Sequence, residues 1–104
     1  MKVRILDAAR QDLTSGFRFY EAQTEGLGSY FLDALFSDID SLQFFAGIHL
    51  VVKGDFYRML SKRFPFAVYY RLEDEIVFVF AVLDCRRSPA WSRKRLTLAT
   101  SRDE

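Results

Sequence analysis

The sequence is poor in the residues on which most catalytic and metal sites depend. Its 104 residues include one cysteine, Cys85, and one histidine, His49. A disulfide within the chain, a site built from several histidines and cysteines, and a histidine pair for acid–base catalysis are therefore excluded. A Cys85–His49 nucleophilic pair stays open, although a lone cysteine at the end of a buried strand usually serves packing. We expect no metal and no cofactor.

Long apolar runs are also absent. The longest, Ile76 to Leu83, has eight residues, whereas a membrane-spanning helix needs about 18 or more. The N-terminus lacks the charged start, apolar stretch and cleavage site of a secretory signal. We therefore expect a cytoplasmic protein without membrane association, folded as one domain over residues 1–104.

Two motifs that resemble enzyme signatures have simpler interpretations. Gly26-Leu27-Gly28 lacks the preceding strand and the third glycine of a dinucleotide-binding loop. Glu73-Asp74-Glu75 offers three carboxylates, but such a cluster at a hairpin tip is usually a solvated turn. Neither motif indicates catalysis.

The N-terminal half shows a short strand followed by helical periodicity. Residues 2–6 alternate and predict a strand, ended by Asp7 as the N-cap of a helix. An apolar stripe at every third or fourth position predicts that helix over 8–23, and Gly16 weakens it without forbidding it. After the break at 26–28, the same periodicity predicts a second helix over 27–46, so the two helices should pack as an antiparallel hairpin.

The C-terminal half is strand-like. Alternation and turn residues predict an edge strand over 48–52 and then antiparallel strands over 57–62, 66–72 and 75–84, with a tight turn at 73–75. The last strand is apolar at every position from 76 to 83, which indicates that both of its faces are covered. The helical hairpin would cover one face, and something else must cover the other.

A terminal helix should complete the fold. Pro89 suits its first turn, Ser88 its N-cap, and the helix is expected over 89–97, with 101–104 disordered. The predicted class is α+β: an N-terminal strand, an antiparallel helical hairpin, an antiparallel β-sheet of three to four strands and a short C-terminal helix.

Aromatic and basic residues are the abundant features. Eleven phenylalanines in a small chain indicate apolar surface that a partner covers. Residues 51–104 carry eleven basic and seven acidic side chains, against four and seven in residues 1–50. Any anion-binding face should therefore lie in the second half.

The basic residues gather at strand ends. Strand alternation puts Arg58 and Lys62 on one face, and Arg86 and Arg87 follow the central strand, so these charges should converge. Arginine matches phosphate oxygens and Trp91 would stack a base, which suits a nucleic acid. Solubilising strand ends, or a surface that pairs with an acidic protein segment, stay open as alternatives.

The order of several weak motifs is more specific than any one of them. They are Phe19-Tyr20-Glu21, Gly26-Leu27-Gly28 before a helix bearing Phe31, Arg58, Arg63-Phe64-Pro65-Phe66, Tyr70, Ala81-Val82 and Arg86-Arg87-Ser88-Pro89-Ala90-Trp91. With these motifs the chain resembles the RelE/ParE superfamily of toxins from bacterial type II toxin–antitoxin modules. The resemblance implies the same α+β fold. It also implies a cognate antitoxin that covers apolar and basic surface, which would account for the phenylalanines and the uncovered sheet face.

The resemblance also implies site residues. RelE-like members are ribosome-dependent messenger-RNA endonucleases that use Lys and Arg in place of histidine, with an aromatic residue that stacks a base. Anchored on Tyr70, their catalytic positions fall on Arg58, Leu60, Ala67 and Arg87. Leu60 and Ala67 cannot donate hydrogen bonds to a phosphate, and losing one such donor typically costs about a hundredfold or more in rate.

That departure favours the ParE-like or plasmid-stabilisation branch, whose members inhibit DNA gyrase without catalysis. We expect a growth-inhibiting toxin that binds gyrase and is neutralised by its antitoxin. The candidate target-binding residues are Lys62, Arg63, Arg86, Arg87, Trp91, Arg93 and Arg95. The alternatives are a metal-independent endoribonuclease with Arg58 and Arg87 as catalytic residues, and an attenuated toxin that only binds antitoxin. Homodimers and toxin–antitoxin hetero-oligomers both stay open.

Overall fold

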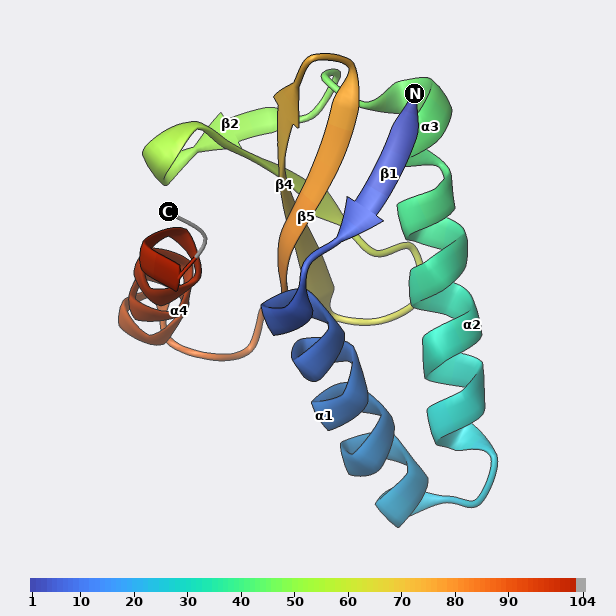
Figure 1. Ribbon diagram of the computed structural model, residues 1–104. Helices are drawn as coiled ribbons and strands as arrows, with labels where there is room; N and C mark the ends of the chain where they lie inside the picture. Colours follow the sequence, from blue (N-terminus) through green and yellow to red (C-terminus); the bar gives the residue numbers. More distant parts are fainter. Residues whose placement is uncertain (103–104) are drawn as a thin grey trace.

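A five-stranded sheet lies between a helical hairpin and a C-terminal helix (Figure 1). The computed structural model describes residues 1–102, apart from the side chains of residues 53 and 100–102. The strand order is β1-β5-β4-β3-β2. The elements are β1 (Lys2–Ile5), α1 (Asp7–Gln23), α2 (Leu27–Asp40), α3 (Leu42–Phe45), β2 (Leu50–Val52), the 3-10 turn η1 (Lys53–Asp55), β3 (Phe56–Leu60), β4 (Phe66–Glu73), β5 (Ile76–Asp84) and α4 (Pro89–Arg102). The predicted α+β class is confirmed.

The first strand and first helix differ from the prediction in two details. β1 pairs parallel with β5, so the sheet is mixed and has five strands, where an antiparallel sheet of three to four was expected. Asp7 is not the N-cap. Helix α1 begins at Asp7 itself, Leu6 occupies the cap position, and no side chain caps the helix. Asp7 can still act on the helix dipole, because its charge lies in the first turn.

The predicted hairpin of two helices is present, and its connection is held by one side chain. The Glu21 carboxylate accepts hydrogen bonds from the backbone N–H groups of Gly26 (3.0 Å) and Gly28 (2.8 Å). Gly26 has φ 88°, a left-handed conformation that glycine adopts without strain.

The second helix does not run unbroken to residue 46. It divides at Ser41 into α2 and α3. The Ser41 hydroxyl donates to the carbonyl of Asp38 (2.6 Å). A serine that bonds back to the preceding turn competes with the helix and bends it. Hydrophobic periodicity does not register such a break.

The strands of the second half match the prediction in order and pairing, but β2 begins at Leu50 where 48 was expected, and β3 ends at Leu60 where 62 was expected. β2 is an edge strand that pairs antiparallel with β3, and β3, β4 and β5 follow in antiparallel order. The β4–β5 connection is a two-residue turn in which Asp74 and Glu75 have φ 51° and 61°. Positive φ at both central residues is the geometry whose twist matches a hairpin.

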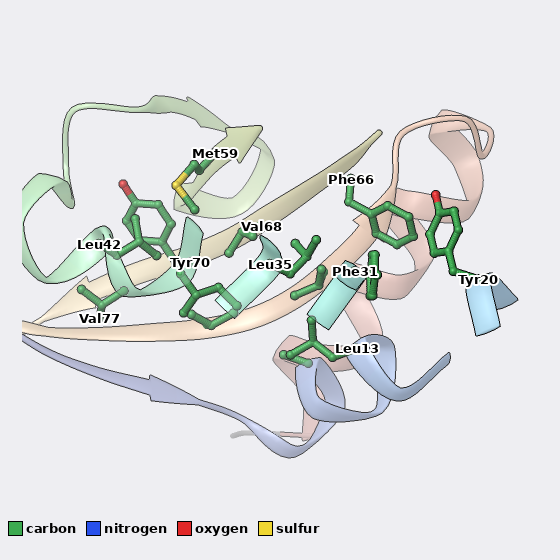
Figure 2. Close-up of a cluster of buried hydrophobic side chains, with 14 residues drawn as sticks. Leu13, Tyr20, Phe31, Leu35, Leu42, Met59, Phe66, Val68, Tyr70 and Val77 are labelled. Carbon is green, nitrogen blue, oxygen red and sulfur yellow. The ribbon is translucent and has the colours of Figure 1, made fainter. Parts of the chain in front are cut away.

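The sheet buries apolar side chains on both faces. One core lies between the sheet and the hairpin, and Figure 2 shows it extending from Tyr20 and Phe66 to Leu42 and Val77. The second core lies on the other face, where Leu96 and Ala99 of α4 pack with Phe80 and Leu83 of β5. The expectation that both faces of β5 are covered is confirmed.

The second face is covered by the chain's own terminal helix. α4 continues to Arg102, beyond the expected end at 97, so the prediction of disorder is wrong for residues 101 and 102. Residues 103 and 104 lie outside the described part. Because α4 supplies the cover, an uncovered sheet face is not an argument for a partner. In the described chain no helix is both long and apolar enough to cross a membrane.

Candidate functional site

Three arginines surround one surface hollow beside α4. The hollow has a volume of about 260 Å³, and its lining includes Arg58 from β3, Arg87 from the β5–α4 loop and Arg93 from α4. These residues are far apart in the chain. They meet because α4 packs on this face of the sheet, where Leu96 and Ala99 share a core with Phe56 of β3 and Tyr69 of β4. We call this site the basic hollow.

Tyr69 and Cys85 hold Arg58 in place within the basic hollow. The Nε of Arg58 donates to the Tyr69 hydroxyl (3.1 Å), and its Nη2 donates to the Cys85 Sγ (3.5 Å). The hydrogen bond to Tyr69 raises the pKa of Arg58, so the guanidinium stays charged. A guanidinium has five N–H donors, so these contacts leave donors available to an incoming acceptor.

Arg87 differs from Arg86 in how its charge is compensated. Arg86 forms an ion pair with Asp84, with Nη2 2.8 Å from Oδ2. Hydrogen bonding to Arg86 lowers the pKa of the Asp84 carboxyl, which stays ionised. Arg87 and Arg93 have no ion pair with a carboxylate in the chain as described, residues 1–102. Their charge is therefore available to an external anion.

An aromatic groove adjoins the basic hollow, and Arg87 lines both. The groove has a volume of about 390 Å³ and lies between α1 and the start of α4, with Phe19 and Trp91 among its lining residues. The guanidinium of Arg87 lies over the Trp91 ring, 4.7 Å from its centroid. The Ser88 hydroxyl accepts a hydrogen bond from the backbone N–H of Trp91 (3.2 Å), so Ser88 is the N-cap of this helix, as predicted.

Two predicted binding residues lie elsewhere. Lys62 and Arg63 line a third hollow, of about 300 Å³, with Tyr30 and Asp38 of α2. The expectation that Arg58 and Lys62 share a face is wrong, because β3 ends at Leu60 and strand alternation stops there. Arg63 donates to the Tyr30 hydroxyl (3.0 Å).

Arg95 is engaged inside the protein. Its side chain is 18% exposed and pairs with Asp12 of α1, with Nη2 2.6 Å from Oδ2. It also donates to the carbonyl of Ala8 (2.9 Å). The geometry therefore gives Arg95 a structural role in joining α4 to α1, where the sequence had placed it in the target-binding set.

The two positions that lack basic residues are beside the basic hollow. Leu60 and Ala67 are paired across β3 and β4, next to the Arg58–Tyr69 pair on the same face of the sheet. Ala67 is fully buried, whereas Leu60 is exposed. Neither Leu60 nor Ala67 has a side-chain hydrogen-bond donor, whereas the resemblance to RelE-like toxins would require a donor at both positions.

Sequence reasoning missed Tyr69 and Phe19 as site residues. Tyr69 is the cross-strand partner of Arg58. Alternation along β4 puts Tyr69 on the face opposite Tyr70, so the sequence could have predicted the face on which Tyr69 lies. Phe19 is half exposed at the end of α1, and the Arg86 guanidinium lies 5.8 Å from its ring centroid. The sequence alone carries no signal that α1 reaches the start of α4.

The fold is shared with solved toxin–antitoxin proteins. A chain of the chromosomal ParDE toxin–antitoxin system from P. aeruginosa superposes with a TM-score of 0.74 and 15% identity, covering 79% of this chain and 92% of that one. The isolated RelE toxin of E. coli gives a TM-score of 0.59 and 18% identity, covering 93% and 97%. No protein-family model and no curated protein matches the sequence. The chain therefore has the RelE/ParE fold, as predicted.

Proposed function

We propose that this protein is the toxin of a type II toxin–antitoxin pair and acts by binding a macromolecular target, with DNA gyrase as the first candidate. The RelE/ParE fold supports the class. The single observation that carries a binding role is the basic hollow, where Arg58, Arg87 and Arg93 converge. Arg87 and Arg93 have no ion pair in the described chain.

The composition of the surrounding surface favours binding over cleavage. A phosphoryl-transfer site needs several donors fixed around the reacting phosphate. Next to Arg58 the sheet offers an exposed leucine and a buried alanine, Leu60 and Ala67. A basic surface with an aromatic neighbour is sufficient for electrostatic docking on an acidic protein or a protein–DNA complex.

Replacing Arg87 by alanine tests the role of the basic hollow. Arg87→Ala should raise the concentration needed to inhibit gyrase supercoiling by about tenfold or more, because a charge-assisted contact contributes roughly 1.5–3 kcal/mol. Arg18→Ala is the matched control, since Arg18 is exposed on α1, away from the basic hollow. The proposal fails if wild-type protein neither inhibits supercoiling nor traps gyrase on DNA.

Endoribonuclease activity is the second candidate, supported by the shared location of Arg58 and Arg87. In this case both side chains would contact a messenger-RNA phosphate on the ribosome, and Trp91 would stack a base. Mapping transcript 5′ ends after induction decides between the two functions. New ends linked to codons that disappear in Arg58→Ala would establish cleavage, and their absence would eliminate it.

A cognate antitoxin is the expected partner under either function. A protein segment with acidic residues would fit the unpaired arginines, and its apolar side chains would fit the aromatic groove. Co-expression with the product of the adjacent reading frame should restore growth. Normal growth when the chain is expressed alone would instead indicate an attenuated toxin.

A further inference from the structure

The strand β2 leaves one edge of the sheet open. β2 pairs with β3 on one side and is the last strand in the order β1-β5-β4-β3-β2, with no strand beyond it among residues 1–102. Natural edge strands are usually protected by charged side chains, proline or a bulge. β2 consists of Leu50, Val51 and Val52 and has none of these protections.

Exposed apolar side chains lie on both faces of this edge. Leu50 is 74% exposed and Val51 52% exposed, and alternation directs them to opposite faces. Ile48 precedes the strand and is 74% exposed, and Leu60 of β3, on the same face as Leu50, is 59% exposed. We call Ile48, Leu50, Val51 and Leu60 the edge patch. Both faces of an added strand would therefore meet apolar contacts.

We propose that the edge patch is a homodimer interface in which β2 pairs antiparallel with β2 of a second copy. A two-fold interface brings one surface against itself, so it tolerates apolar residues and disfavours a single sign of charge. Residues 44–52 contain no Asp, Glu, Lys or Arg. An acidic partner would find nothing in this segment to pair with, whereas a second copy finds a matching apolar strand.

The two copies of Arg58 would not repel each other strongly in such a dimer. Antiparallel pairing about an axis perpendicular to the sheet keeps corresponding faces on the same side and gives one continuous ten-stranded sheet. The two copies of Arg58, each one strand away from β2, would be separated by three strand spacings, about 14 Å. This exceeds the screening length of about 8 Å at physiological salt. Both basic hollows would then lie on one face of the dimer.

The interface is small, so the equilibrium should depend on concentration. β2 has three residues, and a stable interface buries about 800 Å² on each partner. Four partly exposed side chains offer less than that. We therefore expect monomers at low concentration and dimers at high micromolar concentration, rather than a permanent dimer.

Sedimentation velocity over a concentration series tests the proposal. The wild-type protein should shift from monomer to dimer, and the double variant Leu50→Lys, Val51→Lys should stay monomeric over the same range. Leu98→Lys is the matched control, because Leu98 is 51% exposed on α4, outside the edge patch. Circular dichroism and thermal melting establish that each variant is folded.

Cysteine cross-linking provides an independent measurement that does not require the dimer to be disrupted. In a Cys85→Ser background, Val51→Cys should form an intermolecular disulfide at least several-fold faster than Leu98→Cys. Monomers at every concentration, or a dimer unaffected by the two lysines, would overturn the proposal. A third result would also overturn it: the wild-type protein is a monomer, and antitoxin neutralises the wild type but not the double variant. In that case the edge patch would bind the antitoxin.

Discussion

Asp12 joins three elements that are distant in the sequence. Its carboxylate accepts from the Val82 N–H (3.0 Å) and pairs with Arg95. The last residue of β1, Ile5, is opposite Val79, so β1 does not reach the Val82 N–H. Asp12 takes over as its acceptor, and the same carboxylate attaches α4. Burial raises the pKa of Asp12 more than Arg95 and Val82 lower it.

Asp12→Ala should therefore be strongly destabilising even though the ion pair itself contributes little. Removing Asp12 leaves the Val82 N–H without its acceptor, and it leaves the partly buried charge of Arg95 with the Ala8 carbonyl but without a carboxylate. Loss of this kind costs about 3 kcal/mol in the free energy of unfolding. Urea denaturation would measure it, with Asp33→Ala as a control on the exposed face of α2. Equal midpoints for the two variants would contradict this role for Asp12.

We expect His49 to make the stability of the fold depend on pH near neutrality. Its Nδ1 lies 2.5 Å from the hydroxyl of Tyr70, which itself accepts from the Gly47 N–H (2.9 Å). Because the Tyr70 oxygen accepts from Gly47, the hydroxyl can donate its own proton to Nδ1 of a neutral His49 ring. Burial lowers the pKa of His49. The folded chain therefore binds a proton less readily than the unfolded chain, whose histidine has an ordinary pKa of about 6.5.

The sign of the pH dependence follows from that difference. As the pH falls through about 6.5, the unfolded state gains a proton first, so the free energy of unfolding decreases. Urea denaturation at pH 7.5, 6.5 and 5.5 should show this decrease in the wild type and a smaller one in His49→Gln. Parallel pH profiles would show that other groups determine it.

At the scale of elements, two glycines determine how closely the hairpin packs. A Cβ on Gly16 of α1 would lie 2.5 Å from ring atoms of Phe31 in α2, and one on Gly28 would lie 2.7 Å from the ring and carbonyl of Phe17. These contacts are reciprocal, since each helix places a glycine under an aromatic ring of the other. The glycine that weakens α1 by propensity is therefore required for its packing.

Gly16→Ala separates these two effects. Helix propensity alone would favour alanine by about 1 kcal/mol. The ring of Phe31 is fully buried, so overpacking should prevail and destabilise the protein by about 1–3 kcal/mol. Thermal denaturation would give the sign, and Ser15→Ala, on the exposed face of the same helix, is the control. A more stable Gly16→Ala protein would contradict the packing argument.

Elements were predictable where local periodicity determines them, and the α1 helix and the β3–β5 strands follow their patterns closely. The parallel pairing of β1 with β5 was not predictable, because more than 60 residues of chain separate the two strands. No local sequence pattern indicates which strand β1 pairs with. The extent of α4 was missed because Leu96 and Ala99 become apolar contacts only once the sheet is beneath them. Arg58 and Arg87 meet at the basic hollow, as expected from a strand residue and a residue that follows the central strand. Lys62 lines a different hollow and Arg95 pairs with Asp12, because tertiary contacts set their neighbours.

At the scale of the whole molecule, the charged and the uncharged interaction surfaces adjoin each other, because Leu50 of the edge patch is paired with Arg58 of the basic hollow across β2 and β3. The basic hollow lies where the β5–α4 loop meets β3, and the edge patch follows the uncharged segment that ends in β2. Target binding through arginines and association through apolar strands depend on different forces. Salt screens the first and leaves the second unchanged or slightly stronger.

Raising the salt from 50 to 250 mM should therefore weaken binding of the protein to immobilised gyrase several-fold, because attraction between exposed charges is screened. Arg87→Ala should bind more weakly at low salt and lose less affinity as salt rises, since one of the screened contacts is already gone. The monomer–dimer equilibrium, followed by sedimentation in the same buffers, should not shift toward monomer. If gyrase binding and dimerisation weakened together, the two surfaces would not be independent, and a dimer would be the form that binds the target.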